Sequence, residues 1–205
     1  MSNRSIHTLL KNWDEECPLT REEAVEVLNL PEEEMDSLME CAYALRTKYK
    51  GKKVSVQLLT NVRSGNCTQN CAYCAQSKDS QAEIEKYKRV SDEKLYGDND
   101  LVDEKHLARH CIGLSGIGFS DEEIEDLADR IREMKKKDTQ ICCSIGFLTE
   151  KQARILKDAG LDRINHNLNS SRSFYPEICT THTYDQRVNN IKMLQSLGFE
   201  ICSGG

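Results

Sequence analysis

The sequence predicts an α/β fold, a parallel (βα) barrel of TIM type that is truncated to about five βα units and follows an N-terminal helical extension. Three observations support this prediction. Short apolar segments that favour strands alternate with amphipathic helical segments from residue 54 onward. A polar loop rich in cysteine follows the first strand, where parallel folds place their sites. Residues 1–50 carry only helical patterns.

Composition fits a globular protein and argues against two classes of partner. The chain has 205 residues, of which 38% are hydrophobic and 30% are charged. The net charge of -6 disfavours nucleic-acid binding, and the lysines at 135–137 fit the end of a helix. Residues 1–10 are too polar for a signal peptide, and no apolar run reaches the length of a membrane span. We expect a cytoplasmic protein that binds neither nucleic acid nor membrane.

The N-terminal segment, residues 1–50, is predicted to be a helical unit of its own. Thr20 and Glu23 have the spacing of a capping box. Apolar residues then repeat on one helical face, at Met35, Leu38, Met39, Ala42 and Leu45. Gly51 ends this segment, so residues 51–205 are assigned to the partial barrel.

Five short apolar segments are predicted as strands of the sheet: residues 54–60, 110–114, 140–145, 162–168 and 199–203. Val54 and Val56 are β-branched, which favours a buried first strand. Because an eight-stranded barrel needs about 250 residues, we expect either an open barrel or a fragment of a longer chain.

Helices are predicted between the strands. Ser120 with Glu123, and Thr149 with Gln152, have capping-box spacing. A further helix carries Val188, Ile191, Leu194 and Leu197 on one face. The first crossover helix is expected within residues 95–109. Right-handed crossovers of this kind place a site at the carboxyl ends of the strands.

The loop after the first strand holds Cys67, Cys71 and Cys74, spaced by three and then two intervening residues. Ten cysteines in a chain expected inside the cell indicate thiols and metal ligands rather than disulfides. Three thiolates can hold three irons of a 4Fe-4S cubane and leave the fourth iron open to a cofactor. Zinc is the main alternative, although the nearby sequence supplies no fourth ligand.

Side chains alternate between the two faces of a strand, and this alternation predicts which face each of the other cysteines lies on. Cys142 shares a face with Ser144, while Cys143 shares the more apolar face that packs under helices. By the same parity Cys111 and Cys202 turn inward with Cys142, so a second cluster becomes possible. The remaining cysteines, Cys17, Cys41, Cys143 and Cys179, are interpreted as small buried hydrophobes.

A row of asparagines lies at the end of the fourth predicted strand. Asn165, Asn167 and Asn169 have equal parity, and their amides suit recognition of ribose or urea groups. The alternative interpretation of Asn169 is a turn residue. His166 has the opposite parity and is interpreted as a satisfied buried histidine. Arg187 falls within a helical pattern, where an ordinary surface role is the alternative.

These residues carry a resemblance to the radical S-adenosylmethionine (SAM) enzymes, through the pattern CxxxCxxC of Cys67, Cys71 and Cys74. Over residues 54–205 the chain resembles the biotin synthase family in successive blocks. The blocks are Asn70-Cys71-Ala72-Tyr73-Cys74-Ala75-Gln76-Ser77, Ala159-Gly160-Leu161-Asp162-Arg163, Asn165-His166-Asn167, Thr180-Thr181-His182-Thr183-Tyr184 and Cys202-Ser203-Gly204-Gly205.

The resemblance implies a 4Fe-4S cluster on Cys67, Cys71 and Cys74, whose open iron binds SAM and whose electron yields a 5'-deoxyadenosyl radical. The substrate implied is dethiobiotin, and the inserted sulfur comes from a 2Fe-2S cluster held by Cys111, Cys142 and Cys202. By similarity, SAM is bound by Tyr73, Asn167, Asn169 and Arg187, and Asn165 binds the ureido group of dethiobiotin. A flavodoxin or ferredoxin type electron donor and a homodimer of the full-length enzyme are also implied.

Two departures from the family are visible. Asn169 stands where the family commonly has Asp, so the ribose contact would lack a charge. The family also continues beyond the Ser-Gly-Gly block, with an arginine that completes the ligands of the second cluster. Two alternatives stay open: another radical SAM reaction, and a non-catalytic truncated chain that binds only a cluster or zinc.

Overall fold

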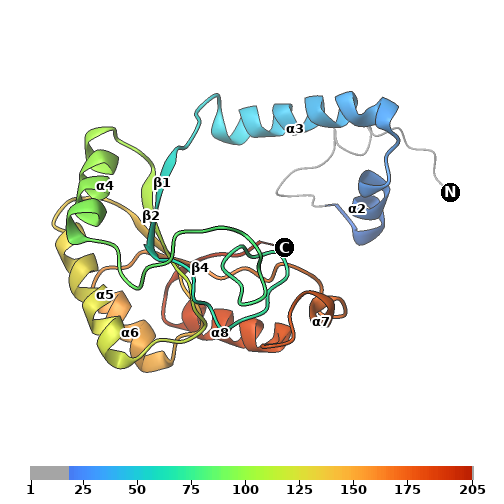
Figure 1. Ribbon diagram of the computed structural model, residues 1–205. Coiled ribbons are helices and arrows are strands. Elements are labelled where there is room, and N and C mark those ends of the chain that lie inside the picture. Colours follow the sequence, from blue (N-terminus) through green and yellow to red (C-terminus); the bar gives the residue numbers. More distant parts are fainter. Residues whose placement is uncertain (1–18, 205) are drawn as a thin grey trace. The chain divides into compact units, whose positions relative to one another are not determined.

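The computed structural model describes residues 19–204, and the predictions for residues 1–10, Cys17 and Gly205 lie outside them (Figure 1). The chain forms two compact units, Met1–Val54 and Ser55–Gly205. None of the described helices has both the length and the apolar character needed to cross a membrane.

The described part of the first unit is helical. Helix α2 (Arg21–Leu28) begins at the capping box of Thr20 and Glu23, with both reciprocal hydrogen bonds formed. A short 3-10 turn, η1 (Glu32–Glu34), leads into helix α3 (Met35–Lys50). Helix α3 ends at Gly51, whose φ of 60° lies in the left-handed region that glycine adopts without strain.

The second unit contains a parallel five-stranded sheet whose spatial order follows the sequence, β1-β2-β3-β4-β5. The strands are β1 (Gln57–Arg63), β2 (Arg109–Leu114), β3 (Ile141–Ser144), β4 (Arg163–Asn165) and β5 (Glu200–Cys202). A sheet of consecutive parallel strands joined by helices is the arrangement of part of a (βα) barrel. The predicted fold class is therefore confirmed.

The first strand begins later than predicted. Val54 and Val56 are 78% and 54% exposed, and pairing with β2 starts at Gln57, opposite Arg109. In the described sheet β1 is an edge strand, and its burial alternates, with Thr60 buried and Leu59 exposed. The prediction of a buried strand from residue 54 was wrong, because β-branched residues favour an extended backbone without supplying a pairing partner.

The helices of this unit follow the predicted alternation. They are α4 (Asp92–Glu104), α5 (Asp121–Met134), α6 (Glu150–Asp158), α7 (Tyr175–Ile178) and α8 (Tyr184–Ser196). The capping boxes at Ser120 and Thr149 are both formed. Helix α4 starts three residues before residue 95, because Ser91 caps the backbone N–H of Lys94.

The core lies between one face of the sheet and these helices (Figure 1). Cys143 and Ile141 of β3 are fully buried in it, together with Ile112 of β2 and Ile164 of β4. Leu127, Ile131, Leu156 and Leu194 cover them from α5, α6 and α8. The prediction that Cys143 packs under the helices is confirmed, and Cys142 lies on the other face of the strand.

At the carboxyl ends of β2 and β3 the backbone approaches itself closely. A Cβ added at Gly146 would lie 2.6 Å from the carbonyl carbon of Ile117 and 2.7 Å from the carbonyl oxygen of Gly116. The next residue, Phe147, donates its N–H to the Ile117 oxygen at 2.7 Å. Both loops line the cavity described below, so this contact shapes its wall.

We predict that Gly146→Ala lowers the free energy of unfolding by about 1–3 kcal/mol, because the new methyl group meets backbone that has to shift. Gly118→Ala is the matched control, since a Cβ there has no neighbour within 4 Å. Urea unfolding measures both variants. Equal stability of the two variants would contradict the close approach.

Candidate active site

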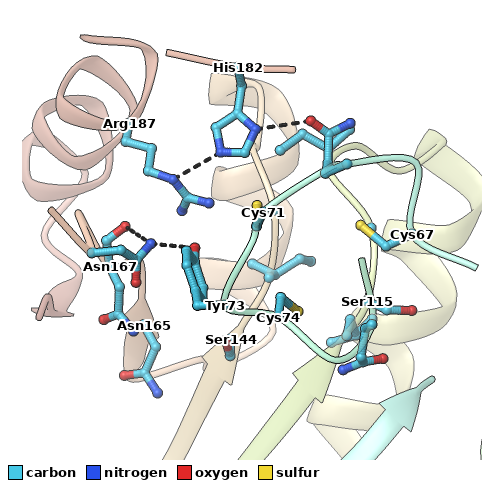
Figure 2. A pocket seen from close by; sticks show the side chains of 18 residues that line it. Cys67, Cys71, Tyr73, Cys74, Ser115, Ser144, Asn165, Asn167, His182 and Arg187 are labelled. Carbon is cyan, nitrogen blue, oxygen red and sulfur yellow. Dashed lines mark hydrogen bonds between the residues drawn. The ribbon is translucent and has the colours of Figure 1, made fainter. Parts of the chain in front are cut away.

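A cavity of about 220 Å³ lies at the carboxyl ends of the strands, under the cysteine loop (Figure 2). Its walls come from the loop after β1, the ends of β2, β3 and β4, and the start of α8. The residues predicted to bind the 4Fe-4S cluster, SAM and the ureido group all line it: Cys67, Cys71, Tyr73, Cys74, Asn165, Asn167, Asn169 and Arg187. Residues from five separate segments therefore meet in one place.

The cysteine loop is held in shape by its own hydrogen bonds. Lys78 donates its backbone N–H to the Gln69 carbonyl at 2.9 Å, and the Gly65 N–H donates to Gln76 Oε1 at 2.8 Å. The buried hydroxyl of Ser115, just after β2, donates to the Gly65 carbonyl at 2.6 Å. The loop is thereby fixed to the sheet at its start and closed on itself across the three cysteines.

Asn70 docks this loop onto the segment between α7 and α8. Its Oδ1 accepts the backbone N–H groups of Thr180 and Thr181 at 3.0 and 3.2 Å. Its Nδ2 donates to Thr180 Oγ1 at 2.6 Å. Nearby, the Ala72 N–H donates to the Ile178 carbonyl at 2.9 Å. One side chain therefore joins segments that are 110 residues apart in the sequence.

The three loop cysteines present their thiols to the cavity. Cys67 and Cys74 are half-buried and Cys71 is buried. Burial and the neighbouring Cys179 thiol raise the pKa of the Cys71 thiol to about 11. Of the described residues that line the cavity, these three alone are cysteines, and the opposite wall carries amides and a guanidinium. This donor set fits a cubane with three thiolate ligands and one open iron.

The asparagine row faces the same cavity, although β4 ends already at Asn165. Asn167 Oδ1 accepts the Gly204 N–H at 3.0 Å, which ties it to the end of β5. Asn169 donates to the Tyr73 hydroxyl at 2.6 Å and has a φ of 65°. Asn169 is therefore both a turn residue and a cavity residue, since asparagine tolerates left-handed backbone.

Arg187 reaches the cavity from α8 (Figure 2). Two neighbours orient its side chain. Its Nε donates to the Tyr175 hydroxyl at 2.6 Å and to His182 Nε2 at 3.2 Å. His182 Nδ1 in turn donates to Gln69 Oε1 at 2.9 Å. Burial and Arg187 lower the pKa of His182 to about 4, so the ring is neutral with its proton on Nδ1. A neutral histidine thus links the cysteine loop to Arg187.

The other predicted cysteines lie apart from this cavity. Cys111 and Cys142 are directly paired across β2 and β3, and both are buried. Their interaction lowers the pKa of the Cys111 thiol to about 7 and raises the pKa of the Cys142 thiol. Cys202 on β5 is exposed, and its partner on β4 is Asn165. The β4 partner of Cys142 is Arg163, two residues earlier on that strand. The structure therefore brings two of these three thiols together, with the third displaced along the strands.

Residues 61–205 match the family described as the Radical SAM superfamily. The chain belongs to this superfamily. Radical SAM enzymes bind SAM at a 4Fe-4S cluster, and the residues that line the cavity fit both groups. The likeness extends to solved structures. Methylornithine synthase matches with a TM-score of 0.81 at 16% identity, covering 96% of this chain and 57% of that chain. The FeFe-hydrogenase maturase of Carboxydothermus hydrogenoformans matches with a TM-score of 0.79 at 20% identity, covering 97% and 47%.

Within the radical SAM superfamily, curated relatives of higher identity are biotin synthases. The proteins from Geobacillus kaustophilus and Bacillus subtilis are each 40% identical to this chain over 187 residues. The match covers 91% of this chain and 56% of each relative. The chain thus spans about half the length of the curated relatives it matches.

Sequence patterns did not predict the positions of two residues at the cavity, Cys179 and His182. Cys179 was interpreted only as a buried hydrophobe, yet its Sγ lies 3.8 Å from that of Cys71. His182 was quoted only within a family block, and its bonds to Gln69 and Arg187 were not foreseen. The spacing Cys179-x-x-His182 was the available signal, because ligand pairs separated by two residues are frequent at metal sites.

We predict that Asn70→Ala lowers the free energy of unfolding by about 1–3 kcal/mol, since the N–H groups of Thr180 and Thr181 lose their acceptor. The reconstituted variant should also retain less iron per chain, because the loop is no longer docked. Thr68→Ala is the control in the same loop, since Thr68 Oγ1 bonds only to the neighbouring Gln69 amide among the contacts described. Urea unfolding and iron analysis measure the two effects. Indistinguishable variants would exclude the docking role.

His166 gives a second prediction, on pH. The ring is 1% exposed, and neither ring nitrogen has a hydrogen-bond partner among the described residues, so it is buried but not satisfied. Burial lowers its pKa to about 4, below the ordinary value of 6.5. The unfolded chain therefore binds a proton that the folded chain does not, and the free energy of unfolding falls as pH falls between these values.

The expected contribution of His166 is about 1.4 kcal/mol per pH unit within that window. His166→Leu should reduce the loss of stability between pH 7 and pH 5 by about 2 kcal/mol, because about 1.5 pH units of that interval lie below 6.5. The buried His110 and His182 should account for the rest of the loss. His106→Gln, at an exposed histidine, is the control for the loss of an imidazole. Urea unfolding at the two pH values measures this. An unaltered pH dependence in His166→Leu would contradict the assignment.

Proposed function

We propose that this chain carries the radical-generating and substrate-binding part of a biotin synthase, the radical SAM sulfurtransferase that inserts sulfur into dethiobiotin to form biotin. The observation that carries the proposal is the cavity, in which cluster, cofactor and substrate residues meet. The 40% identity to curated biotin synthases supports the choice of reaction.

In this proposal Cys67, Cys71 and Cys74 hold the 4Fe-4S cluster, which would supply the electron that cleaves SAM into methionine and a 5'-deoxyadenosyl radical. Arg187 binds the SAM carboxylate, because Tyr175 and His182 hold its Nε and leave the rest of its guanidinium for the cavity. Asn167 and Asn169 bind the ribose through amide groups. Tyr73 lies against the adenine and is held by Asn169.

Asn165 is proposed to bind the ureido group of dethiobiotin, since an amide matches both its carbonyl and its N–H groups. Asn165 Oδ1 also accepts a hydrogen bond from the Cys142 thiol, at 3.1 Å. Asn165 therefore lies between the radical SAM cavity and the thiol pair of Cys111 and Cys142. This is where a substrate must lie if a radical forms on one side and sulfur arrives from the other.

The second cluster is proposed as a 2Fe-2S cluster on Cys111, Cys142 and Cys202. The inward face shared by Cys111 and Cys142 supports the first two ligands, and equal parity supports the third. We further propose a flavodoxin or ferredoxin type electron donor, a homodimer of the full-length enzyme, a cytoplasmic location, and a domain division into residues 1–50 and 51–205.

Anaerobic reconstitution tests the proposal. The chain is loaded with iron and sulfide, reduced, and mixed with SAM and dethiobiotin, and 5'-deoxyadenosine and sulfur-containing products are measured by mass spectrometry. Both products together support the proposed reaction. Cleavage of SAM that dethiobiotin does not stimulate points to another radical SAM reaction. Stoichiometric zinc without any cluster would contradict both enzyme interpretations.

The two sets of cysteines should separate spectroscopically. We predict that Cys111→Ala abolishes the 2Fe-2S absorption and leaves the 4Fe-4S electron paramagnetic resonance signal of the reduced chain intact. Cys143→Ala is the matched control, because Cys143 lies on the helix-covered face beside Cys142. Equal loss of both clusters in Cys111→Ala would overturn the assignment.

A further inference from the structure

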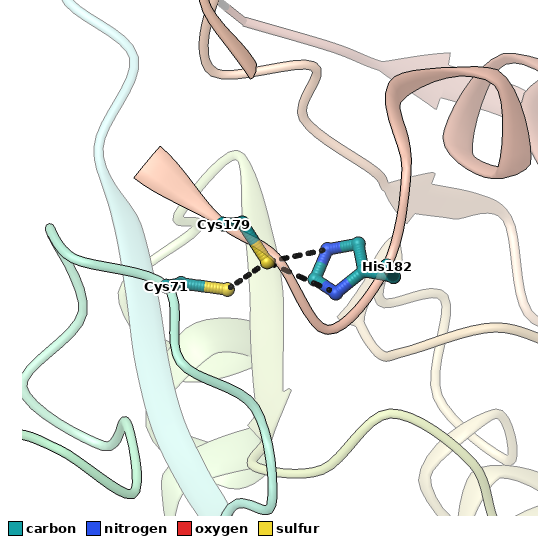
Figure 3. Close-up of side chains that lie close together, drawn as sticks. All are labelled: Cys71, Cys179 and His182. Atoms are coloured by element: carbon teal, nitrogen blue, oxygen red, sulfur yellow. Dashed lines mark hydrogen bonds between the residues drawn. The ribbon is translucent and has the colours of Figure 1, made fainter. Parts of the chain in front are cut away.

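A third group of ligating side chains shares two residues, Cys71 and His182, with the cavity lining. Figure 3 shows this group. Among the described residues, Cys71, Cys179 and His182 form a buried group whose ligand atoms all lie within 4.8 Å of one another. The Cys71 and Cys179 sulfurs are 3.8 Å apart, and the Cys179 sulfur lies 3.3 Å from His182 Nδ1 and 3.8 Å from His182 Nε2. Cys179 comes from the end of α7 and His182 from the turn before α8.

The separation of the two sulfurs matches that between ligands of one tetrahedral zinc ion. Zinc binds sulfur at about 2.3 Å and nitrogen at about 2.0–2.1 Å, which places tetrahedral ligands about 3.8 Å apart for two sulfurs and about 3.5 Å apart for sulfur and nitrogen. The two sulfurs already have this separation without a metal. A turn of the His182 ring that points Nε2 toward the sulfurs lets one ion bind all three.

The protonation of His182 also suits a metal ligand. Gln69 Oε1 can only accept, so the ring proton is on Nδ1, and Arg187 Nε can only donate, so the lone pair is on Nε2. A ligand histidine whose other ring N–H donates to an oxygen is the usual arrangement at zinc. Zinc on Nε2 would take the lone pair to which Arg187 now donates.

Cys71 belongs to both groups. In the cubane, Cys67, Cys71 and Cys74 bind three different irons, so their sulfurs have to lie farther apart than the ligands of a single ion. Cys179 and His182 instead crowd around the Cys71 sulfur alone. One thiol is thus shared by two sites that cannot be filled at the same time.

We propose that the cluster-free chain binds one zinc ion through Cys71, Cys179 and His182, and that zinc at this site blocks assembly of the 4Fe-4S cluster. The second clause rests on the proposed function, whereas the zinc site itself does not. Two thiol protons leave as the two sulfur–zinc bonds form, and water completes the tetrahedron. Two thiolates with an imidazole are ligands that zinc favours.

X-ray absorption of the zinc-loaded wild-type chain tests the site without any variant. The metal-free chain is prepared anaerobically, given one equivalent of zinc, and measured at the zinc edge. We expect two sulfur neighbours and one imidazole in the first shell. Three or four sulfurs without an imidazole would place zinc on the loop cysteines or on Cys111 and Cys142, and would overturn the proposal.

Cobalt(II) provides the affinity measurement, because tetrahedral thiolate sites give it strong visible and charge-transfer bands. Cys179→Ser and His182→Gln should each weaken cobalt and zinc binding more than about 100-fold. Loss of a residue that only hydrogen-bonds to a metal ligand costs about 10- to 100-fold in metal affinity, so a larger loss indicates a direct ligand. Cys67→Ser, Cys74→Ser and Cys111→Ser are the matched controls and should bind as the wild type does. Circular dichroism checks that each variant folds. Wild-type affinity in Cys179→Ser, or equal loss in Cys67→Ser, would contradict the proposed ligands.

Competition is measured by reconstituting zinc-loaded and metal-free chains side by side. Prior zinc should suppress cluster formation in the wild type and have no effect in Cys179→Ser, whose metal-free form should still assemble 4Fe-4S. Unimpeded assembly in zinc-loaded wild type would refute the competition. Failure of every metal-free chain to assemble a cluster would refute the proposed function instead, and the zinc-edge result would still decide the zinc site.

Discussion

Parallel pairing of consecutive strands is the constraint on which the rest of the structure depends. Because β1 to β5 all run in the same direction, their carboxyl ends meet at one edge of the sheet. The cysteine loop, the asparagine row and the start of α8 are separate in the sequence and meet only because of this geometry. Asn70 then fixes the loop over that edge, and Ser115 fixes its origin.

Burial determines the protonation states of the polar groups around the site. His182 is neutral because charging it would require a buried cation beside Arg187, and this neutrality lets one ring nitrogen donate while the other accepts. The Cys71 thiol keeps its proton for a related reason. Metal binding is the event that removes that proton, so the cluster and zinc act on the same chemical group.

Sequence patterns predicted much of this arrangement, because the patterns are local. Capping boxes at Thr20, Ser120 and Thr149 required only neighbouring residues, and strand parity required only alternation. The start of β1 was misplaced, since pairing depends on β2 rather than on Val54. The contact between Cys71 and Cys179 spans 108 residues, so no local pattern could disclose it. The roles of single residues in binding cluster, cofactor and substrate stay predictions.

We propose that Cys67, Cys71 and Cys74 leave one iron of a cubane open to the cavity. Mössbauer spectroscopy of the chain reconstituted with iron-57 tests this directly, because it resolves the individual irons. Addition of SAM should shift the signal of one iron of the four and leave the other three unchanged. Four irons that do not respond to SAM, or a spectrum without any cubane, would contradict the account.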